Sequence, residues 1–331
     1  MAASLIRLGI GTALLFTGLV TVPFMMKDKP LQIDLASDAA SILAWSPDGQ
    51  TLAIGSSDDK VNLWDAQTNK IRRSIQLGSN VVSLAWSPDS MMIATGTWTE
   101  NEEPTVILWD ADTGDTGQTI SIPTQRLRTL SWSPNGKMIS IGLAENTILF
   151  WNIENDVIDI LDVQFDEILN LAWSPSEQLL AAGLQDGTVA VIDSSTHRLL
   201  DRLIYSPNGM GYIADISWSP DGTSLAAAFC DSESSPSATC DLVVWDPTNR
   251  QSRRAFQSGD YDITSVDWSP SGRYIASAYL SGDVTLYNPQ TGKLARTFKT
   301  SLGQTLVAWS PNGQRLAACT EDGSVLVWNL P

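Results

Sequence analysis

The sequence predicts an all-β fold made of seven similar four-stranded units, on the evidence of two repeated marks. The tripeptide Trp-Ser-Pro occurs seven times, beginning at Trp45, Trp86, Trp132, Trp173, Trp218, Trp268 and Trp309. The intervals between these positions are 41, 46, 41, 45, 50 and 41 residues. A second mark, an apolar residue followed by Asp or Asn, closes each unit, as in Trp64-Asp65 and Trp328-Asn329. Units of this period predict a seven-bladed β-propeller of four-stranded antiparallel blades.

The first repeat shows how one blade is built. From Leu43 the chain alternates apolar and polar residues, turns at 46–49, alternates again, turns at 57–60 and ends a third alternating run at Asp65. A fourth strand is expected at 70–76, where Ile71 and Ile75 are the apolar positions. Alternation bounded by Pro, Gly, Asp and Asn is the pattern of strands joined by tight turns.

The seventh repeat lacks a fourth strand, because it ends at Asn329 after three. Residues 31–35 precede the first repeat and alternate correctly, with Leu31, Ile33 and Leu35 on one face. We expect this N-terminal strand to complete the last blade, since closing the ring removes sheet edges that would otherwise aggregate.

These repeats resemble the WD-repeat family of β-propellers over about residues 31–331, and their regularity is most similar to that of prokaryotic members. The resemblance implies a propeller fold and a role in protein interaction. One family feature is missing, the Gly-His dipeptide before the first strand of each repeat. The chain's single histidine, His197, lies in an outer turn, where we expect it to be solvated. The family's buried network through that histidine therefore cannot form, and the repeat tryptophans are expected to compensate by packing.

Residues 1–30 are expected to form a signal-anchor, or transmembrane, helix and a short linker ahead of the propeller at 31–331. Residues 8–26 carry no charge, and 19 residues at 1.5 Å each make about 28 Å of helix, enough to cross a bilayer core. The alternative is a cleaved secretory signal with Arg7 as its basic flank, although no small-x-small cleavage site follows. A linker of 27–30 spans about 13 Å, which would hold the propeller near the membrane.

The net charge limits the class of partner that the chain can bind, and its cysteines indicate the cellular compartment. The formal net charge is −17, which repels phosphate backbones and excludes nucleic acid as a partner. Cys230 and Cys240 flank the neck of a hairpin at facing positions, where a disulfide is expected. A disulfide favours an extracytoplasmic, periplasmic location of the propeller; two free thiols are the alternative. Cys319 is expected to be a small buried core residue.

The residues expected to bind a partner lie in the connections of one face, called the top. Insertions at 97–104 and 231–239 fall in turns between second and third strands, and the connection at 205–212 reaches the same face. Aromatic side chains within a polar rim are typical of protein-recognition surfaces. The alternative for the tryptophan of this set is packing onto its own blade. The predicted partner-binding residues are Trp98, Glu100, Glu102, Glu103, Tyr205, Tyr212, Asp231, Glu233 and Tyr261.

No catalytic, metal or cofactor motif is present. One histidine cannot build a histidine metal cluster or a Ser/Cys–His nucleophile, and no Gly-rich phosphate loop occurs. We therefore expect no cofactor and no enzyme activity, but a membrane-anchored scaffold or accessory subunit of a larger membrane complex, for example an energy-transducing one. The alternatives are a periplasmic sensor or small-ligand binder that uses the central channel, and an enzyme that uses a carboxylate pair.

Overall fold

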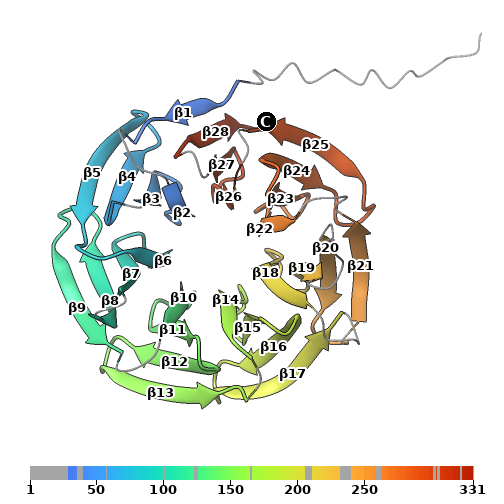
Figure 1. The fold of residues 1–331 in the computed structure, drawn as a ribbon, viewed down its shortest axis with the longest axis horizontal. Helices are drawn as coiled ribbons and strands as arrows, with labels where there is room; N and C mark the ends of the chain where they lie inside the picture. Colours follow the sequence, from blue (N-terminus) through green and yellow to red (C-terminus); the bar gives the residue numbers. More distant parts are fainter. Residues whose placement is uncertain are drawn as a thin grey trace, which may run out of the picture.

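The computed structural model shows a ring of seven four-stranded sheets around a central axis (Figure 1). It describes residues 29–35, 40–56, 58–99, 102–122, 126–164, 166–205, 211–231, 240–249, 251–257, 262–300, 303, 306–320 and 323–330. The transmembrane helix expected at 8–26 lies outside these residues. Within the described ranges no helix is long and apolar enough to cross a membrane.

Each blade runs from an innermost to an outermost strand, and blades are numbered here by their Trp-Ser-Pro. Blades 1 to 4 contain β2 (Ala40–Trp45), β3 (Thr51–Ser56), β4 (Lys60–Asp65) and β5 (Lys70–Gln76); β6 (Val81–Trp86), β7 (Met92–Thr99), β8 (Glu102–Asp110) and β9 (Thr116–Ser121); β10 (Leu127–Trp132), β11 (Met138–Leu143), β12 (Thr147–Asn152) and β13 (Val157–Asp162); and β14 (Ile168–Trp173), β15 (Leu179–Leu184), β16 (Thr188–Asp193) and β17 (Arg198–Ile204).

Blades 5 to 7 follow the same order. They contain β18 (Gly211–Trp218), β19 (Leu225–Asp231), β20 (Cys240–Asp246) and β21 (Gln251–Gln257); β22 (Ile263–Trp268), β23 (Ile275–Tyr279), β24 (Asp283–Tyr287) and β25 (Leu294–Lys299); and β26 (Leu306–Trp309), β27 (Arg315–Cys319), β28 (Val325–Asn329) and β1 (Leu31–Ile33). The predicted all-β, seven-bladed architecture of antiparallel sheets is confirmed.

The N-terminal strand closes the ring as predicted. β1 pairs antiparallel with β28, with Leu31 opposite Val327 and Ile33 opposite Val325 (Figure 1). Ile33 is buried and packs with residues of blades 1 and 7. The strand is short, but its inward side chain joins the two blades that meet at the closure.

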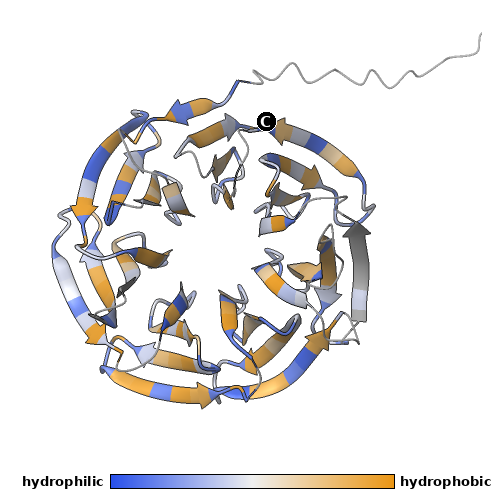
Figure 2. Cartoon of the chain, in the orientation of Figure 1, coloured by the Kyte–Doolittle hydropathy of each residue, from blue (hydrophilic) through white to orange (hydrophobic). Residues whose placement is uncertain are grey.

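The core lies between neighbouring blades. Apolar side chains of the two middle strands of a blade are almost fully buried, as are Leu52, Ile54 and Leu63 of blade 1. Figure 2 shows hydrophobic and hydrophilic residues alternating along the strands. Side chains on one face of a blade pack against the next blade, so that Leu63 shares a cluster with Trp86 of blade 2. Blade-to-blade burial of this kind is the main stabilising interaction in a ring of repeats.

The Ser-Pro half of each mark forms a hydrogen-bonded turn between the first and second strands. The Ser46 hydroxyl accepts the backbone N–H of Thr51 at 2.9 Å and donates to Asp48 Oδ1 at 2.6 Å. The same serine-to-backbone bond, five residues along, forms in all seven blades. Gly49 has φ 71°, a conformation that glycine adopts without strain. The repeated residues are therefore those that this turn requires.

The tryptophan half of the mark joins consecutive blades. The indole N–H of Trp86 donates to the Ala44 carbonyl of blade 1 at 3.0 Å. Trp218 donates to Ala172 of blade 4 at 2.9 Å, and Trp45 donates to Ala308 of blade 7 at 3.2 Å, across the closure. Some of the tryptophans thus add hydrogen bonds between blades to the expected packing, whereas the indole nitrogens of Trp132, Trp268 and Trp309 are buried with no hydrogen-bond partner among the described residues.

Candidate protein-interaction surface

The insertion of blade 2 lengthens a strand hairpin. β7 and β8 have eight and nine residues, and their pairing continues to Thr99 opposite Glu102 after an irregularity at Thr97. Trp98 lies in β7 within this extension. Glu103 in β8 is exposed. The side chains of Trp98 and Glu102, and the whole of Glu100, lie outside the described residues.

The insertion of blade 5 is held at its neck by a disulfide between Cys230 and Cys240. The two residues face each other in β19 and β20, with their Cα atoms 4.1 Å apart. Both are buried and pack against Ile263 and Tyr279 of blade 6. The bond therefore fixes the point where the chain leaves the blade. Cys319 is free and buried in β27.

Tyr205 lies against blade 5. Its hydroxyl donates to Asp241 Oδ2 at 2.9 Å, and its ring meets Phe229 edge-on, with 5.3 Å between centroids. Burial, followed by the bond to Asp241, raises the pKa of Tyr205 to about 12. The tyrosine is therefore a neutral, partly buried residue that supports the root of the blade 5 hairpin.

Two further predicted residues lie at the same hairpin root. Tyr212 stands opposite Cys230 in the sheet and is half-buried. Burial and the nearby charge of Asp262 raise the pKa of its hydroxyl. Asp231 is partly exposed at the end of β19. Glu233 and Tyr261 lie outside the described residues.

The structure therefore gathers the predicted residues at two places. Tyr205, Tyr212 and Asp231 surround the disulfide-bonded neck of blade 5, whereas Trp98 and Glu103 belong to blade 2. Figure 1 shows β7 and β8 across the ring from β19 and β20. A partner that touched both hairpins would have to span the ring.

The inner strands hold two partly buried acids, Asp215 and Asp267, that sequence reasoning missed. Asp215 in β18 accepts hydrogen bonds from the Val266 N–H and the Ser265 hydroxyl of blade 6, both at 2.9 Å. Asp267 in β22 accepts the Trp309 N–H of blade 7 at 2.7 Å. The two carboxyl groups thus join blades 5, 6 and 7 in sequence.

These acids have perturbed pKa values. Loss of hydration on burial raises the pKa of Asp215 to about 6, against the lowering effect of its hydrogen-bond donors. Burial raises the pKa of Asp267 to about 7, and the neighbouring charge of Asp215 adds to the rise. A signal was present in the sequence, since Asp267 occupies the position of Ala44, Ala85 and Ala308 in other repeats. Backbone N–H groups of the next blade already donate to both carboxyl groups, so the two acids act in the structure as links between blades.

The single histidine is also structural, so the expectation of a solvated turn residue is wrong. The His197 ring stacks on Phe150 of blade 3 with 4.0 Å between centroids and 5° between planes. Its Nδ1 lies 3.2 Å from Asp159 Oδ2, and 17% of its side chain is exposed. The turn of blade 4 thereby packs onto blade 3. Among the described residues, no group of three or more His, Cys, Asp or Glu side chains could hold a metal ion.

Two family profiles match the chain. One, described as the WD40 domain of anaphase-promoting complex subunit 4, matches residues 32–89, 157–208 and 244–307. The other, described as WD domain, G-beta repeat, matches residues 72–110 and 292–329. Between them they leave residues 111–156 and 209–243 unmatched, which include β9, the first three strands of blade 3 and the first two strands of blade 5.

Curated relatives match over shorter stretches. The anaphase-promoting complex subunit cdh1 of Dictyostelium discoideum is 30% identical over 130 residues, which cover 38% of this chain and 17% of the relative. The WD repeat-containing protein srw1 of Schizosaccharomyces pombe is 30% identical over 119 residues, 35% of this chain and 21% of the relative. The matches thus span about a fifth of the relatives' length. Both relatives are eukaryotic, so they lend no support to the expected likeness to prokaryotic members.

A solved structure shares the fold over almost the whole chain. The β-propeller domain of Cps50 (Swd1) from Myceliophteria thermophila has a TM-score of 0.74 and 21% identity, and the match covers 91% of this chain and 99% of that domain. At this identity the likeness concerns the fold alone.

Proposed function

The chain belongs to the WD40-repeat propeller family, and from that premise we propose that it is a protein-interaction subunit of a larger assembly, which binds its partner through the top face of the ring. One observation carries the proposal. The two insertions that break the regular repeat both lie between the second and third strands of a blade, in blades 2 and 5. Binding residues are found disproportionately on connections that a rigid scaffold positions.

The names of the similar proteins support a subunit role. One matching profile is described as a domain of an anaphase-promoting complex subunit, and one relative is named as another subunit of that complex. The proposal takes from them only that the chain works within a multisubunit assembly.

The predicted residues would make different kinds of contact with the partner. Trp98 would supply an aromatic anchor, and Glu100, Glu102 and Glu103 a surrounding acidic rim that selects a basic partner. At the other hairpin, Asp231 and Glu233 would add negative charge. The half-buried Tyr205 would hold that hairpin in place rather than enter the partner.

The test compares binding and folding of top-face and control variants. Tagged Trp98→Ala and a charge-reversed Glu100→Lys, Glu102→Lys, Glu103→Lys variant are used to isolate the native complex, with thermal melts of each. Gln67→Lys, an exposed change in the turn between β4 and β5 on the opposite face, is the matched control. Trp98→Ala should weaken binding by about 2 kcal/mol with an unchanged melting temperature. Unchanged binding, or an unfolded Trp98→Ala variant, would remove the top-face proposal.

We propose further that residues 8–26 tether this subunit to a membrane complex, with the propeller on the extracytoplasmic side. The uncharged run and the Cys230–Cys240 disulfide support this. After cell fractionation, the full-length protein should resist alkaline carbonate extraction, and its intact mass should include residues 1–30. A mature protein that begins near Lys27, or one that carbonate releases, would exclude the tether without affecting the top-face proposal.

A further inference from the structure

The outer strand of blade 3, β13, exposes an unusual amount of apolar surface. Val157, Ile158 and Ile160 are exposed by 50%, 40% and 71%. Figure 2 shows this strand as mostly hydrophobic, with hydrophilic interruptions. β13 pairs with β12 on one side, and in the ordering of the sheet its other edge has no neighbour. Exposed apolar side chains on an open strand edge are a site for pairing with another chain.

The other outer strands have structural features that discourage such pairing. The pairings of β5, β9, β17, β21 and β25 with their inner neighbours all contain a register shift, as a β-bulge produces. The remaining outer strand, β1, has only three residues. β13, in contrast, pairs with β12 in unbroken register over all six of its residues. Bulges and short length are recognised ways of protecting an edge, and β13 has neither.

Charge also sets β13 apart. Lys or Arg is present in β5, β17, β21 and β25, and β1 and β9 contain no charged residue, whereas the sequence of β13, VIDILD, contains two aspartates and no cation. From 138 to 196 the chain contains no Lys or Arg but ten acids: Glu145, Glu154, Asp156, Asp159, Asp162, Asp166, Glu167, Glu177, Asp186 and Asp193. Three of them form ion pairs with Lys or Arg, and Asp159 lies beside His197. The side chain of Asp159 is nevertheless 62% exposed.

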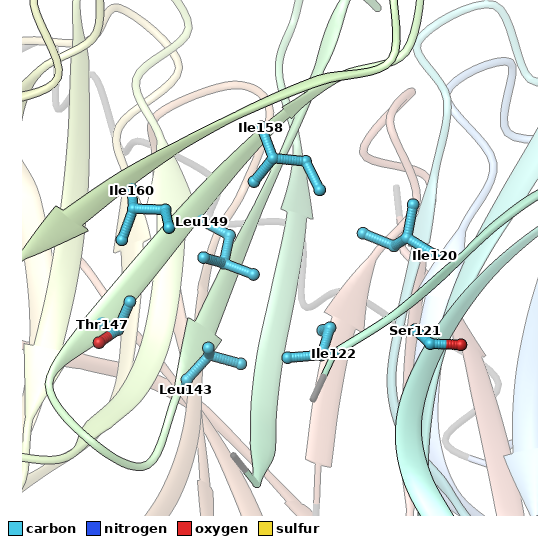
Figure 3. A pocket seen from close by; sticks show the side chains of 8 residues that line it. All are labelled: Ile120, Ser121, Ile122, Leu143, Thr147, Leu149, Ile158 and Ile160. Carbon is cyan, nitrogen blue, oxygen red and sulfur yellow. The ribbon is translucent and has the colours of Figure 1, made fainter. Parts of the chain in front are cut away.

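A groove follows one face of the strand. Its volume is about 370 Å³, and it opens between the outer strands of blades 2 and 3. Figure 3 shows Ile158, Ile160 and Leu149 of blade 3 across the open space from Ile120 and Ile122 of blade 2. The lining is mostly apolar, with Ser121 and Thr147 as its hydroxyl groups.

We propose that the free edge of β13 binds an extended peptide segment of a partner protein, in which apolar and basic residues alternate. The peptide adds a strand to blade 3 through backbone hydrogen bonds. Side chains of an extended strand alternate between two faces. The peptide's apolar residues therefore continue the row of Ile158 and Ile160 into the groove, and its basic residues lie on the other face beside Asp159. Strand addition with pockets for alternate side chains is a general mode of peptide recognition.

Charge decides between this occupant and a second copy of the chain. Each copy carries a net charge of −17, and pairing two β13 edges would bring two acidic segments together. Like charges facing across an interface oppose association, whereas a basic segment is attracted and steered to the site. This surface is separate from the top face and does not depend on the function proposed above.

The test uses the purified full-length chain and a capped, labelled peptide of alternating lysine and valine, about eight residues long to match a strand. Binding is followed by fluorescence anisotropy and by amide hydrogen exchange. The peptide should slow exchange in residues 157–162 and leave β17 unchanged. Ile160→Lys, which adds a cation at an exposed edge position, should weaken binding at least about tenfold. Leu200→Lys, a matched change at an exposed position of the bulged β17, should alter it less than about twofold.

Peptide controls separate strand addition from charge attraction. An isomer with its lysines and valines in separate blocks keeps the charge but loses the alternation, and a peptide N-methylated at alternate residues loses backbone donors. Both should bind much more weakly than the probe. Equal binding of either one, equal binding to Ile160→Lys, or no protection of β13 would overturn the proposal. A concentration-dependent dimer of the chain that Ile160→Lys abolishes would assign the edge to a second copy instead. The Trp98→Ala variant should bind the peptide normally, so failure here and failure at the top face are distinguishable.

Discussion

The Trp-Ser-Pro tryptophans differ in what their indole nitrogens contact. Trp86 donates to the carbonyl of Ala44, whereas the Trp132 nitrogen is buried with no hydrogen-bond partner among the described residues. Both rings are almost fully buried. Trp86→Phe should therefore cost about 1 kcal/mol of unfolding free energy more than Trp132→Phe, the value of one hydrogen bond to a neutral group. Urea denaturation of both variants measures the difference. Equal losses would mean that the tryptophans join the blades by packing alone.

The raised pKa values of the inner-strand acids predict a pH dependence of stability that is opposite in sign to that of most carboxyl groups. Because folding raises the pKa of Asp267 to about 7 from 3.8, the folded state binds this proton more tightly than the unfolded chain does. Its contribution to the free energy of unfolding is therefore greatest below the unfolded pKa and is lost as pH rises toward 7.

Asp267→Asn removes the charge and keeps an oxygen that can accept the Trp309 N–H. At about pH 8 the variant should be more stable than the wild type by on the order of 2–4 kcal/mol, and the gain should shrink at about pH 5. Thermal melts at both pH values measure it. A stability gain of the variant that does not change with pH, or a loss of stability at both pH values, would contradict a raised pKa of Asp267 in the folded protein.

At the scale of the element, the Cys230–Cys240 bond closes a short loop at the neck of the blade 5 hairpin. The chain-entropy model assigns such a loop roughly 2.5–3 kcal/mol. A Cys230→Ala, Cys240→Ala variant should lose about this much stability in guanidinium titration, and a reducing agent should destabilise the wild type but not the variant. Peptide mapping of the unreduced protein checks the pairing. Free thiols at both positions in native protein would contradict the bond and remove the main support for an extracytoplasmic propeller.

The spacing of the repeated marks located the insertions, but it could not predict whether each one forms a loop or extends a hairpin. The marks of blade 2 lie 23 residues apart instead of the usual 19, which is compatible with either a loop or a longer hairpin. The outcome depends on pairs such as Thr99 with Glu102, which are local and have no periodic signature. The unbroken register of β13 was equally hidden, because the turn before it matches those of bulged blades in length. Packing against neighbouring blades decides whether a bulge forms.

At the scale of the molecule, period and alternation were sufficient to predict seven blades and the closure by residues 31–35. Each blade contacts mainly its neighbours, so its pattern is repeated in the sequence. The polar contacts between blades were not predictable to the same degree. Asp215 and Asp267 depend on backbone donors 51 and 42 residues away, and His197 depends on Phe150, 47 positions earlier.

The closure itself can be tested with two residues of the same strand. Ile33→Ala removes the buried side chain of β1 and should cost about 2 kcal/mol. Leu31→Ala, at the more exposed position of the strand, should cost less than about 0.5 kcal/mol. Thermal melts with light scattering measure stability and aggregation together. Equal effects of the two changes would show that β1 does not hold the ring closed through Ile33.

The pairing of β1 with β28 also sets a delay during synthesis. Leu31 cannot pair until Val327 has been synthesised, 296 positions later in the chain. At typical ribosome speeds of about 5–20 residues per second, the wait is roughly 15–60 s. Neighbouring blades can pack as they emerge, since each depends mainly on the one before it. Throughout that interval the nascent protein is an open arc of blades. The apolar face of blade 1 that will pack against β1, β27 and β28 is accessible to chaperones and to other unfinished chains.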